Sequence, residues 1–384
     1  MATAAPLATT DPTPANVDQE SLDPLLREAL HRLAAAEATN VGYPRAADID
    51  YSPLAPFLRF MINNVGDSRA NPTYPLHTME LERSVLNWFA TLLRAGSRWT
   101  GYLATGSTEG TLHSLRQARA KLIDPVVFHS TAAHYSAGKA ARVLGLPTVV
   151  VDAGLRGEMD YADLSAKVSQ HSSRAAIVVA TIGTTMTEAV DSVPAIRREL
   201  DAAGAARRWI HADAALAGAP LALSGRRDFD LAPGGADSVV ISGHKWWGTP
   251  IPCAVTMATH QTLRDSRLIA YVGNRDTTIT GSRSGLSAAL LWHAITNQPL
   301  HEQEERVTQA RAVAAYACHR LASIGWPCWR NLDAITVVLR QLPKPLAQRW
   351  PLPVENGWSH VICMPGITTD QIDHLVTDLE GTLR

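Results

Sequence analysis

One lysine of the chain stands where carbonyl chemistry is possible. Lys245 ends the stretch Ser-Gly-His-Lys at 242–245, which directly follows the apolar run 238–241. A short run of β-branched and apolar residues is typical of a buried strand. A lysine at the end of such a strand is partly desolvated, which favours the neutral amine that forms a Schiff base with an aldehyde. The alternative is an ordinary surface lysine.

A carboxylate follows a second strand-like run. Asp213 comes directly after the residues 209–212. The alternative role for an aspartate at this place is to cap the next helix. A lysine and an aspartate at two strand ends are what pyridoxal 5′-phosphate requires, since the lysine binds the aldehyde and the aspartate keeps the ring nitrogen protonated. The pair Lys245 and Asp213 therefore predicts a site for this cofactor.

A loop of small residues offers a place for the phosphate. The residues 101–110 are rich in glycine, serine and threonine, and 111–119 have helical spacing. Free backbone N–H groups at the start of a helix bind phosphate. Gly106 permits close approach, and the hydroxyls of Ser107 and Thr108 are further donors. The alternative is that Ser107 or Thr108 only caps the helix.

Two further strand ends carry side chains suited to the cofactor ring. His134 follows the strand-like run 126–128 and is placed to stack on a planar ring. Its alternative is an ordinary histidine at a strand end. The run 177–181 ends in hydroxyls, so Thr181 or Thr184 lines the ring, or else caps the next helix.

Together these residues resemble the group II pyridoxal-phosphate amino-acid decarboxylases, most closely the branch of bacterial histidine decarboxylase and plant serine decarboxylase. The resemblance runs from about residue 45 to near the C-terminus. The motifs that carry it lie, in the family's order, at 64–67, 77–82, 105–110, 134–136, 182–185, 211–216, 242–245, 250–253, 274–279, 281–285 and 360–365.

The resemblance implies a role for each site residue. Lys245 binds the cofactor aldehyde, Asp213 pairs with the pyridine nitrogen, and His134 stacks on the ring. The groups expected around the phosphate are Gly106, Ser107, Thr108, Ser242 and His244.

The resemblance also implies an obligate homodimer with shared active sites. Ser282 is expected to reach the phosphate of the neighbouring subunit. A proton donor to Cα is expected in the loop from about 268 to 281, where Tyr271 is the candidate. The alternative for Tyr271 is an ordinary aromatic side chain packed against the sheet.

Several positions depart from the family pattern. They are Thr105, Thr111, Ala214, Leu286 and the pair Trp246-Trp247. These changes suggest a reshaped, more apolar substrate pocket, so histidine and another neutral amino acid both remain open as substrates. Two other functions remain as alternatives. One is a different pyridoxal-phosphate reaction: an aminotransferase, a lyase or an oxidative decarboxylase. The other is a non-catalytic homologue.

The pattern of apolar runs indicates an α/β protein. Strand-like and helical stretches alternate from about 80 to 300, which predicts a mostly parallel sheet flanked by helices on both faces. With the resemblance, this is the large domain of a fold-type I pyridoxal-phosphate enzyme, followed by a small C-terminal α+β domain that begins with a helix over 302–324. The predicted division is an N-terminal arm and helical segment at 1–79, a cofactor-binding domain at 80–300 and the small domain at 301–384.

Composition limits the partners and the compartment. The 384 residues have a formal net charge of −1, which argues against a nucleic-acid partner. The four cysteines show neither metal-ligand spacing nor a disulfide framework, so we predict no metal site and a cytoplasmic location. We find no apolar run of membrane-spanning length and no signal peptide, and expect no membrane partner.

Overall fold

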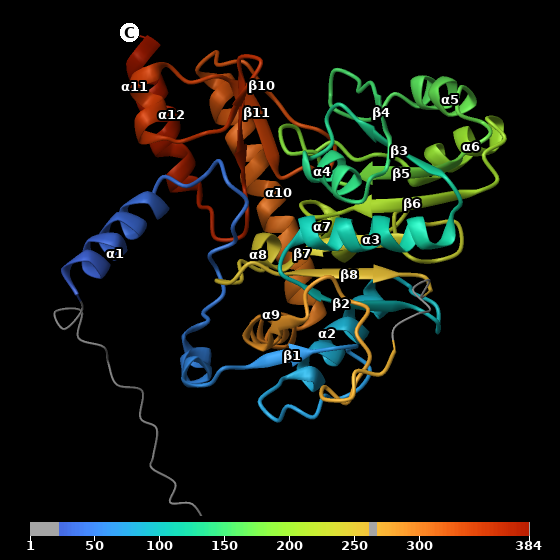
Figure 1. The fold of residues 1–384 in the computed structure, drawn as a ribbon. Helices are drawn as coiled ribbons and strands as arrows, with labels where there is room; N and C mark the ends of the chain where they lie inside the picture. The colour runs from blue at the N-terminus through green and yellow to red at the C-terminus, as the bar shows by residue number, and fades with distance from the viewer. Residues whose placement is uncertain (1–22, 261–266, 384) are drawn as a thin grey trace, which may run out of the picture.

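The structure is a computed structural model that describes residues 23–260 and 267–383. Its largest element is a seven-stranded sheet with the order β2-β8-β7-β6-β5-β3-β4, in which only β8 runs against the others (Figure 1). The strands are β2 (Thr100–Ala104), β3 (Pro125–Ser130), β4 (Thr148–Val151), β5 (Ala175–Thr181), β6 (Arg208–Asp213), β7 (Ser238–Ser242) and β8 (Ala254–Ala258). The predicted α/β class with a mostly parallel sheet is confirmed.

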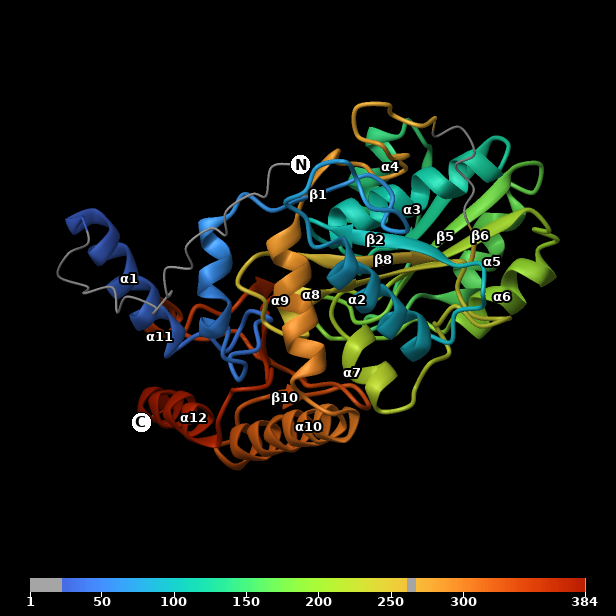
Figure 2. The ribbon, with the colours of Figure 1, turned by 90° about the horizontal axis from the view of Figure 1, so that it is seen from below.

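Helices cover both faces of this sheet (Figure 2). They are α2 (Met79–Leu92), α3 (Ser107–Lys121), α4 (Ser136–Val143), α5 (Tyr161–Ser169), α6 (Val193–Ala202), α7 (Gly218–Leu223), α8 (Gly243–Trp246) and α9 (Gly285–Thr296).

Alternate residues of each central strand serve opposite cores, because successive side chains of a strand point to opposite faces. In β5, Ile177 packs with α3 and α4, whereas Val178 packs with α5 and α6. A strand buried on both sides reads as a continuous apolar run, which is why the runs in the sequence predicted these strands.

Strand β2 corrects one prediction. We expected the residues 101–110 to form a loop, but residues 101–104 belong to a strand at the edge of the sheet. Gly101 suggested a loop because glycine disfavours strands. Here it allows close approach to β8, since a Cβ at Gly101 would lie 2.4 Å from the carbonyl oxygen of Thr256. Only Thr105 and Gly106 remain as the connection to α3.

The C-terminal part forms a second, antiparallel sheet with the order β10-β11-β13-β12. It consists of α10 (Leu300–Ser323), β10 (Cys328–Trp329), β11 (Thr336–Arg340), α11 (Lys344–Arg349), β12 (Val354–Glu355), β13 (Trp358–Ile362) and α12 (Thr369–Leu383). Helix α10 joins the two parts, because Val307 packs in the core of the large sheet and Leu321 in the C-terminal core. The predicted boundaries at residues 79 and 300 stay predictions.

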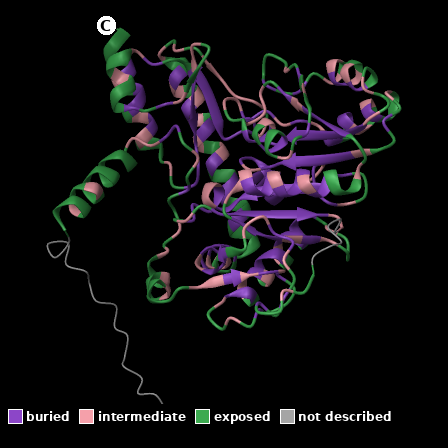
Figure 3. Ribbon diagram, in the orientation of Figure 1, coloured by how far each residue is buried: buried purple, intermediate pink, exposed green. Residues whose placement is uncertain are grey.

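The N-terminal segment lies across both parts. It consists of α1 (Pro24–Glu37), a 3₁₀ helix η2 (Ser52–Arg59) and β1 (Asn63–Val65), which pairs with β9 (Ser282–Ser284). Helix α1 has no buried residue and projects from the body of the chain (Figure 3). The first 22 residues of the predicted N-terminal arm and helical segment lie outside the described residues.

Candidate active site

The carboxyl ends of β5, β6 and β7 open onto a cavity of about 520 Å³. Ligands of open α/β sheets bind at this edge, and the volume is that of a small-molecule site. Nine of the predicted site residues line the cavity: Gly106, Ser107, Thr108, His134, Thr181, Asp213, Ser242, His244 and Lys245. Tyr271 and Ser282 are not among its lining residues.

Lys245 lies on the cavity wall in the short helix α8, which begins where β7 ends. Burial lowers the pKa of its amine, and the nearby carboxylate of Asp213 opposes this shift. A lowered pKa increases the fraction of neutral, nucleophilic amine at neutral pH. The alternative of a surface lysine is therefore wrong.

Asp213 is the last residue of β6 and is 5 % exposed. It is not a helix cap, because the N-cap of α7 is Ala217. His134 faces the same cavity, where burial lowers its pKa against the effect of Asp213. Its Nδ1 lies 2.8 Å from the hydroxyl of Ser136, which fixes the orientation of the ring. A carboxylate, an imidazole and an amine thus converge on one cavity.

The start of α3 forms an anion site. Gly106 is the N-cap, and no side chain caps the helix, so Ser107 and Thr108 lie in the first turn and are not caps as the alternative had it. The Ser107 hydroxyl lies 2.7 Å from that of Ser242 at the end of β7. His244 Nδ1 lies 3.0 Å from the carbonyl oxygen of Cys253, so Nδ1 carries the proton. Two hydroxyls and uncapped N–H groups suit a phosphate.

Thr181 provides a test of whether the residues fit a cofactor. Its Oγ1 is buried and has no hydrogen-bond partner among the described residues, although Thr181 lines the cavity. A buried hydroxyl normally has a partner. Thr184, the other candidate, instead bonds Thr187 at 2.8 Å. The cavity therefore holds an amine, a carboxylate, an anion site and an unused hydroxyl, and these groups fit pyridoxal phosphate.

Glu109 is a cavity residue that the sequence did not indicate. Its Oε2 accepts hydrogen bonds from the Thr105 N–H at 2.8 Å and the Thr105 hydroxyl at 2.6 Å. Its Oε1 accepts one from the hydroxyl of Tyr102 at 2.8 Å. This contact between the third helical residue and the chain before the N-cap fixes the loop that enters α3. Glu109 thus holds the anion site in place.

The N-terminal segment and the C-terminal sheet complete the cavity. Their lining residues are Gly42, Tyr43, Pro44, Pro353, His360 and Ile362. His360 is 1 % exposed and its Nε2 lies 3.1 Å from the Gly42 carbonyl oxygen; burial lowers its pKa. Sequence patterns did not assign these residues to the site, because they lie far from Lys245 along the chain.

The inference of a reshaped apolar pocket is not supported. Ala214, Trp246 and Trp247 are fully buried in the core of the large sheet and do not line the cavity. Thr111 is also buried, where its hydroxyl lies 3.3 Å from His211 Nε2. Leu286, on α9, is not a lining residue either. Of the departures from the family pattern only Thr105 reaches the cavity, and it is polar.

Tyr271 and Ser282 lie on the surface of the chain. The Tyr271 side chain is 86 % exposed, so the alternative that it packs against the sheet is wrong. Its carbonyl oxygen accepts a hydrogen bond from the Thr73 hydroxyl at 2.8 Å. Ser282 is exposed on β9, where its hydroxyl accepts a hydrogen bond from Asn63 Nδ2 at 3.1 Å.

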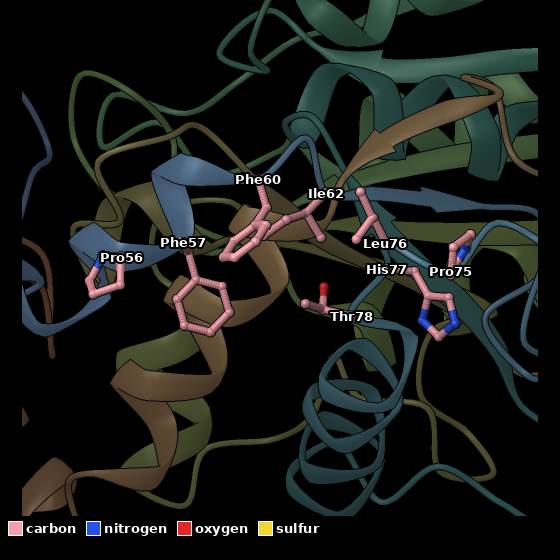
Figure 4. A pocket seen from close by; sticks show the side chains of 8 residues that line it. All are labelled: Pro56, Phe57, Phe60, Ile62, Pro75, Leu76, His77 and Thr78. Atoms are coloured by element: carbon pink, nitrogen blue, oxygen red, sulfur yellow. The ribbon is translucent and has the colours of Figure 1, made fainter. Parts of the chain in front are cut away.

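A second, apolar groove of about 320 Å³ lies beside β1 (Figure 4). Its lining residues are Pro56, Phe57, Phe60, Ile62, Pro75, Leu76, His77 and Thr78. It shares no residue with the first cavity and lacks a lysine or a carboxylate, so we assign no chemistry to it. Within the described ranges there is no cluster of potential metal ligands and no helix that is both long and apolar enough to span a membrane.

Comparison with known proteins agrees with this geometry. Residues 46–280, more than half of the chain, match the pyridoxal-dependent decarboxylase conserved domain. The chain is 37% identical over 372 residues to a histidine decarboxylase of Mesorhizobium japonicum, which covers 96% of this chain and 99% of that protein. A histidine decarboxylase of Acinetobacter baumannii is 37% identical over 88% of this chain and 90% of its own.

Among solved structures, L-methionine decarboxylase from Streptomyces sp.590 superposes with a TM-score of 0.83 and 26% identity, covering 94% of this chain and 96% of its own. The match to the decarboxylase domain and the similarity to whole decarboxylases support decarboxylation over an aminotransferase or lyase reaction. The chain therefore belongs to the pyridoxal-dependent decarboxylase family, and is an amino-acid decarboxylase that uses pyridoxal 5′-phosphate.

Proposed function

We propose that the protein converts L-histidine to its amine and carbon dioxide. The observation that carries this proposal is that three polar side chains, Tyr43, Thr185 and His360, line the same cavity as Lys245. Hydroxyl and imidazole groups there suit a substrate side chain with hydrogen-bonding nitrogens. The similarity to histidine decarboxylases over most of the chain supports the same substrate.

Each residue of the site would have a separate role. Pyridoxal phosphate, when bound, supplies an electron sink for the negative charge left at Cα after carbon dioxide departs. Lys245 would hold the aldehyde, Asp213 would keep the proton on the ring nitrogen, and His134 would fix the ring plane. Ser107, Ser242 and the start of α3 would bind the phosphate. Which bond to Cα breaks depends on how the substrate is held, so positioning by these groups would decide the reaction.

A second candidate substrate is an apolar amino acid such as methionine. The lining of the cavity also includes four apolar residues, Pro44, Leu216, Pro353 and Ile362. The similarity in fold to a methionine decarboxylase is consistent with such a substrate. A site that hydrogen-bonds its substrate rejects an apolar analogue strongly, whereas an apolar site separates close homologues by only about 10–200-fold. The pattern of discrimination therefore separates the two candidates.

The deciding experiment offers histidine, methionine, serine, valine, leucine and phenylalanine in competition and identifies the amines by mass spectrometry. Histidine as the only efficient substrate is the expected result. Amines from several aliphatic amino acids at similar rates would favour the apolar candidate. A keto acid or an aldehyde in place of the amine would show that the product chemistry is not simple decarboxylation.

We further propose a homodimer in which each subunit completes the site of the other. Tyr271 and Ser282 are exposed and lie off the cavity of their own chain. In the partner's site Tyr271 would donate the proton to Cα and Ser282 would reach the phosphate. The exposed apolar groove beside β1 and the exposed leucines of α1, Leu25 and Leu26, are surfaces that a second copy would cover.

Light scattering coupled to size exclusion measures the oligomeric state directly. An active monomer at the assay concentration would contradict the shared site. Mixing Tyr271→Phe subunits with Lys245→Ala subunits tests sharing more sharply, because hybrid dimers regain one intact site only if Tyr271 acts across the interface.

We propose that the protein is located in the cytoplasm. The four cysteines, Cys253, Cys318, Cys328 and Cys363, are all free thiols. Free thiols are typical of proteins in a reducing compartment.

A further inference from the structure

A buried carboxylate joins two walls of the cavity. Glu188 lies in the loop between β5 and α6 and is 3 % exposed. Its Oε2 accepts hydrogen bonds from the N–H of Ile335 at 3.1 Å, the N–H of Thr336 at 2.8 Å and the Thr336 hydroxyl at 2.5 Å. Thr336 is the first residue of β11, so one oxygen atom ties a loop of the large sheet to the C-terminal sheet.

The backbone of Glu188 is in an unfavourable conformation. Its φ is 51°, in the left-handed region that residues with a Cβ disfavour. The conformation is held by hydrogen bonds from Glu188 N to Thr184 O at 2.8 Å and from Ala189 N to Thr184 Oγ1 at 3.0 Å. The carboxylate is also buried, and burial raises its pKa to about 7. A glycine at this position would avoid both the left-handed strain and the burial of a carboxylate. The contacts that the Glu188 side chain makes must therefore account for its presence here.

Both partners of this contact lead directly to the cavity. On one side, the loop that ends at Glu188 carries Gly183 and Thr185 to the lining. On the other side, Thr336 pairs with Ile362 of β13, and Val338 pairs with His360. Ile362 and His360 both line the cavity. The strand that Glu188 contacts, β11, thus lies next to β13, whose residues line the cavity. The C-terminal sheet faces the carboxyl ends of the parallel strands (Figure 1).

Most of the residues that would hold the cofactor take no part in this contact. Asp213 and Ser242 end strands of the large sheet, and Ser107 and Lys245 lie on α3 and α8, the helices that follow β2 and β7. A change in the distance between the C-terminal sheet and the 183–189 loop would therefore move the substrate side of the cavity and leave the cofactor side in place.

We propose that Glu188 is a positioning residue that sets the substrate-side wall of the cavity by holding β11 against the 183–189 loop. This inference rests on the proposed decarboxylation of an amino acid and names a residue that tunes the fit of that substrate. It predicts a specific kinetic signature: a change in KM for the amino acid at constant affinity for the cofactor.

The test compares three variants at the contact of Glu188 with Ile335 and Thr336, which we call the joint. Glu188→Gly removes the carboxylate and relieves the left-handed backbone. Glu188→Gln keeps an oxygen acceptor for the three donors, and Thr336→Val removes only the hydroxyl contact. Glu188→Gly leaves three buried donors without their acceptor, so it should raise KM about tenfold or more, while Glu188→Gln should stay within about threefold of wild type. The affinity for pyridoxal phosphate, measured by absorbance titration, should remain within about twofold in all three.

Tyr316→Phe is the matched control. The Tyr316 hydroxyl donates to Asp373 at 2.8 Å, which joins α10 to α12 within the C-terminal part without touching the joint. This variant should lower stability and leave KM unchanged. Amide hydrogen exchange at 335–336 and 360–362 should increase in Glu188→Gly and stay at the wild-type level in Tyr316→Phe.

Two results would overturn the inference. One is a wild-type KM in both Glu188→Gly and Thr336→Val. The other is a parallel loss of cofactor affinity and turnover in Glu188→Gly, which would indicate general destabilisation. Failure of the proposed function looks different, because the wild-type enzyme would then form no amine from any amino acid offered, while the exchange measurement would still report on the joint.

Discussion

The hydroxyls of Ser107 and Ser242 lie 2.7 Å apart, although the two residues come from different strand–helix connections. Ser107 opens α3 and Ser242 ends β7, so the contact marks the point where two chain segments meet at the anion site. A phosphate bound between the segments, as we propose, would accept hydrogen bonds from both hydroxyls.

Ser242→Ala should weaken the binding of pyridoxal phosphate by about 10–100-fold, because a hydrogen bond to a charged group contributes about 1.5–3 kcal/mol. Ser107→Ala should act similarly, and the double variant should lose less than the sum, since both hydroxyls serve one anion. Absorbance titration of the apoprotein measures these affinities. Ser130→Ala is the control, because Ser130 is buried at the end of β3 but does not line the cavity. Equal losses in the control would contradict the assignment.

Lys245 should be the residue that carries the cofactor. Borohydride reduction should fix pyridoxal phosphate on the peptide that contains Lys245, and Lys245→Ala should abolish this labelling together with the yellow colour of the protein. The lowered pKa of Lys245 increases the fraction of neutral amine that can react with the aldehyde. Peptide mapping by mass spectrometry identifies the site; a label on Lys121 or Lys139 would refute the assignment.

Asp213→Ala should bind the cofactor more weakly, by roughly 1.5–3 kcal/mol, and lose nearly all turnover, because an unprotonated ring nitrogen makes a poor electron sink. Initial rates of amine formation at saturating cofactor separate the two effects. Asp160→Ala is the control, since Asp160 only caps α5 and its loss should cost about 1 kcal/mol of stability without affecting the chemistry. Turnover of Asp213→Ala within a few-fold of wild type would rule out the proposed role.

Arg283→Met should destabilise the fold by about 3–5 kcal/mol, because it leaves the buried carboxylate of Glu82 without its partner. Arg283 Nη2 donates to both oxygens of Glu82 at 2.9 Å, and both side chains are almost fully buried. Urea unfolding measures the change. Adding Glu82→Gln should recover part of the loss, since the amide oxygen still accepts from the N–H of Leu103.

The exposed pair of Arg349 and Asp378 provides the comparison for this experiment. Arg349→Ala should cost less than about 1 kcal/mol, because solvent screens exposed pairs. A similarly small cost for Arg283→Met would show that the buried pair has no structural role.

The stability that Glu188 and Asp191 contribute should fall as the pH rises from about 4 through 7, against the buried histidines, whose lowered pKa values act in the opposite direction. Burial raises the pKa of Glu188 from its ordinary 4.5, and that of Asp191 from its ordinary 3.8, to about 7 in each case. The native state then binds more protons than the unfolded state between these values, so these groups stabilise the fold fully below the ordinary pKa and lose that contribution as the pH passes 7. The loss is on the order of 3 kcal/mol for each group.

Thermal or urea unfolding across this pH range measures the slope. Asp191→Asn should remove the contribution of Asp191, so stability should fall less, or rise more, with pH than in the wild type, because an amide does not titrate, while the amide oxygen still accepts from the N–H groups of Met159 and Thr181. An unchanged slope in Asp191→Asn would mean that other groups dominate the pH dependence.

The sequence alone predicted the fold and the cofactor side of the cavity. The strands of a parallel sheet are continuous apolar runs, and their carboxyl ends meet at one edge, so Asp213 and Lys245 could be placed together without coordinates. The strand-like run 177–181 ends at the same residue as β5. Local signals suffice here because the central strands β5, β6 and β7 are buried on both faces.

The substrate side was decided only by the tertiary structure. Tyr43 and His360 reach the cavity from opposite ends of the chain, and no local pattern reports such a meeting. Sequence neighbours of Lys245 were misleading for a related reason: successive side chains of a helix point in different directions, so Lys245 lines the cavity while Trp246 and Trp247 are buried in the core. The joint between Glu188 and Thr336 likewise exists only after the C-terminal sheet has docked, because the partners of a buried carboxylate are chosen by packing between distant elements.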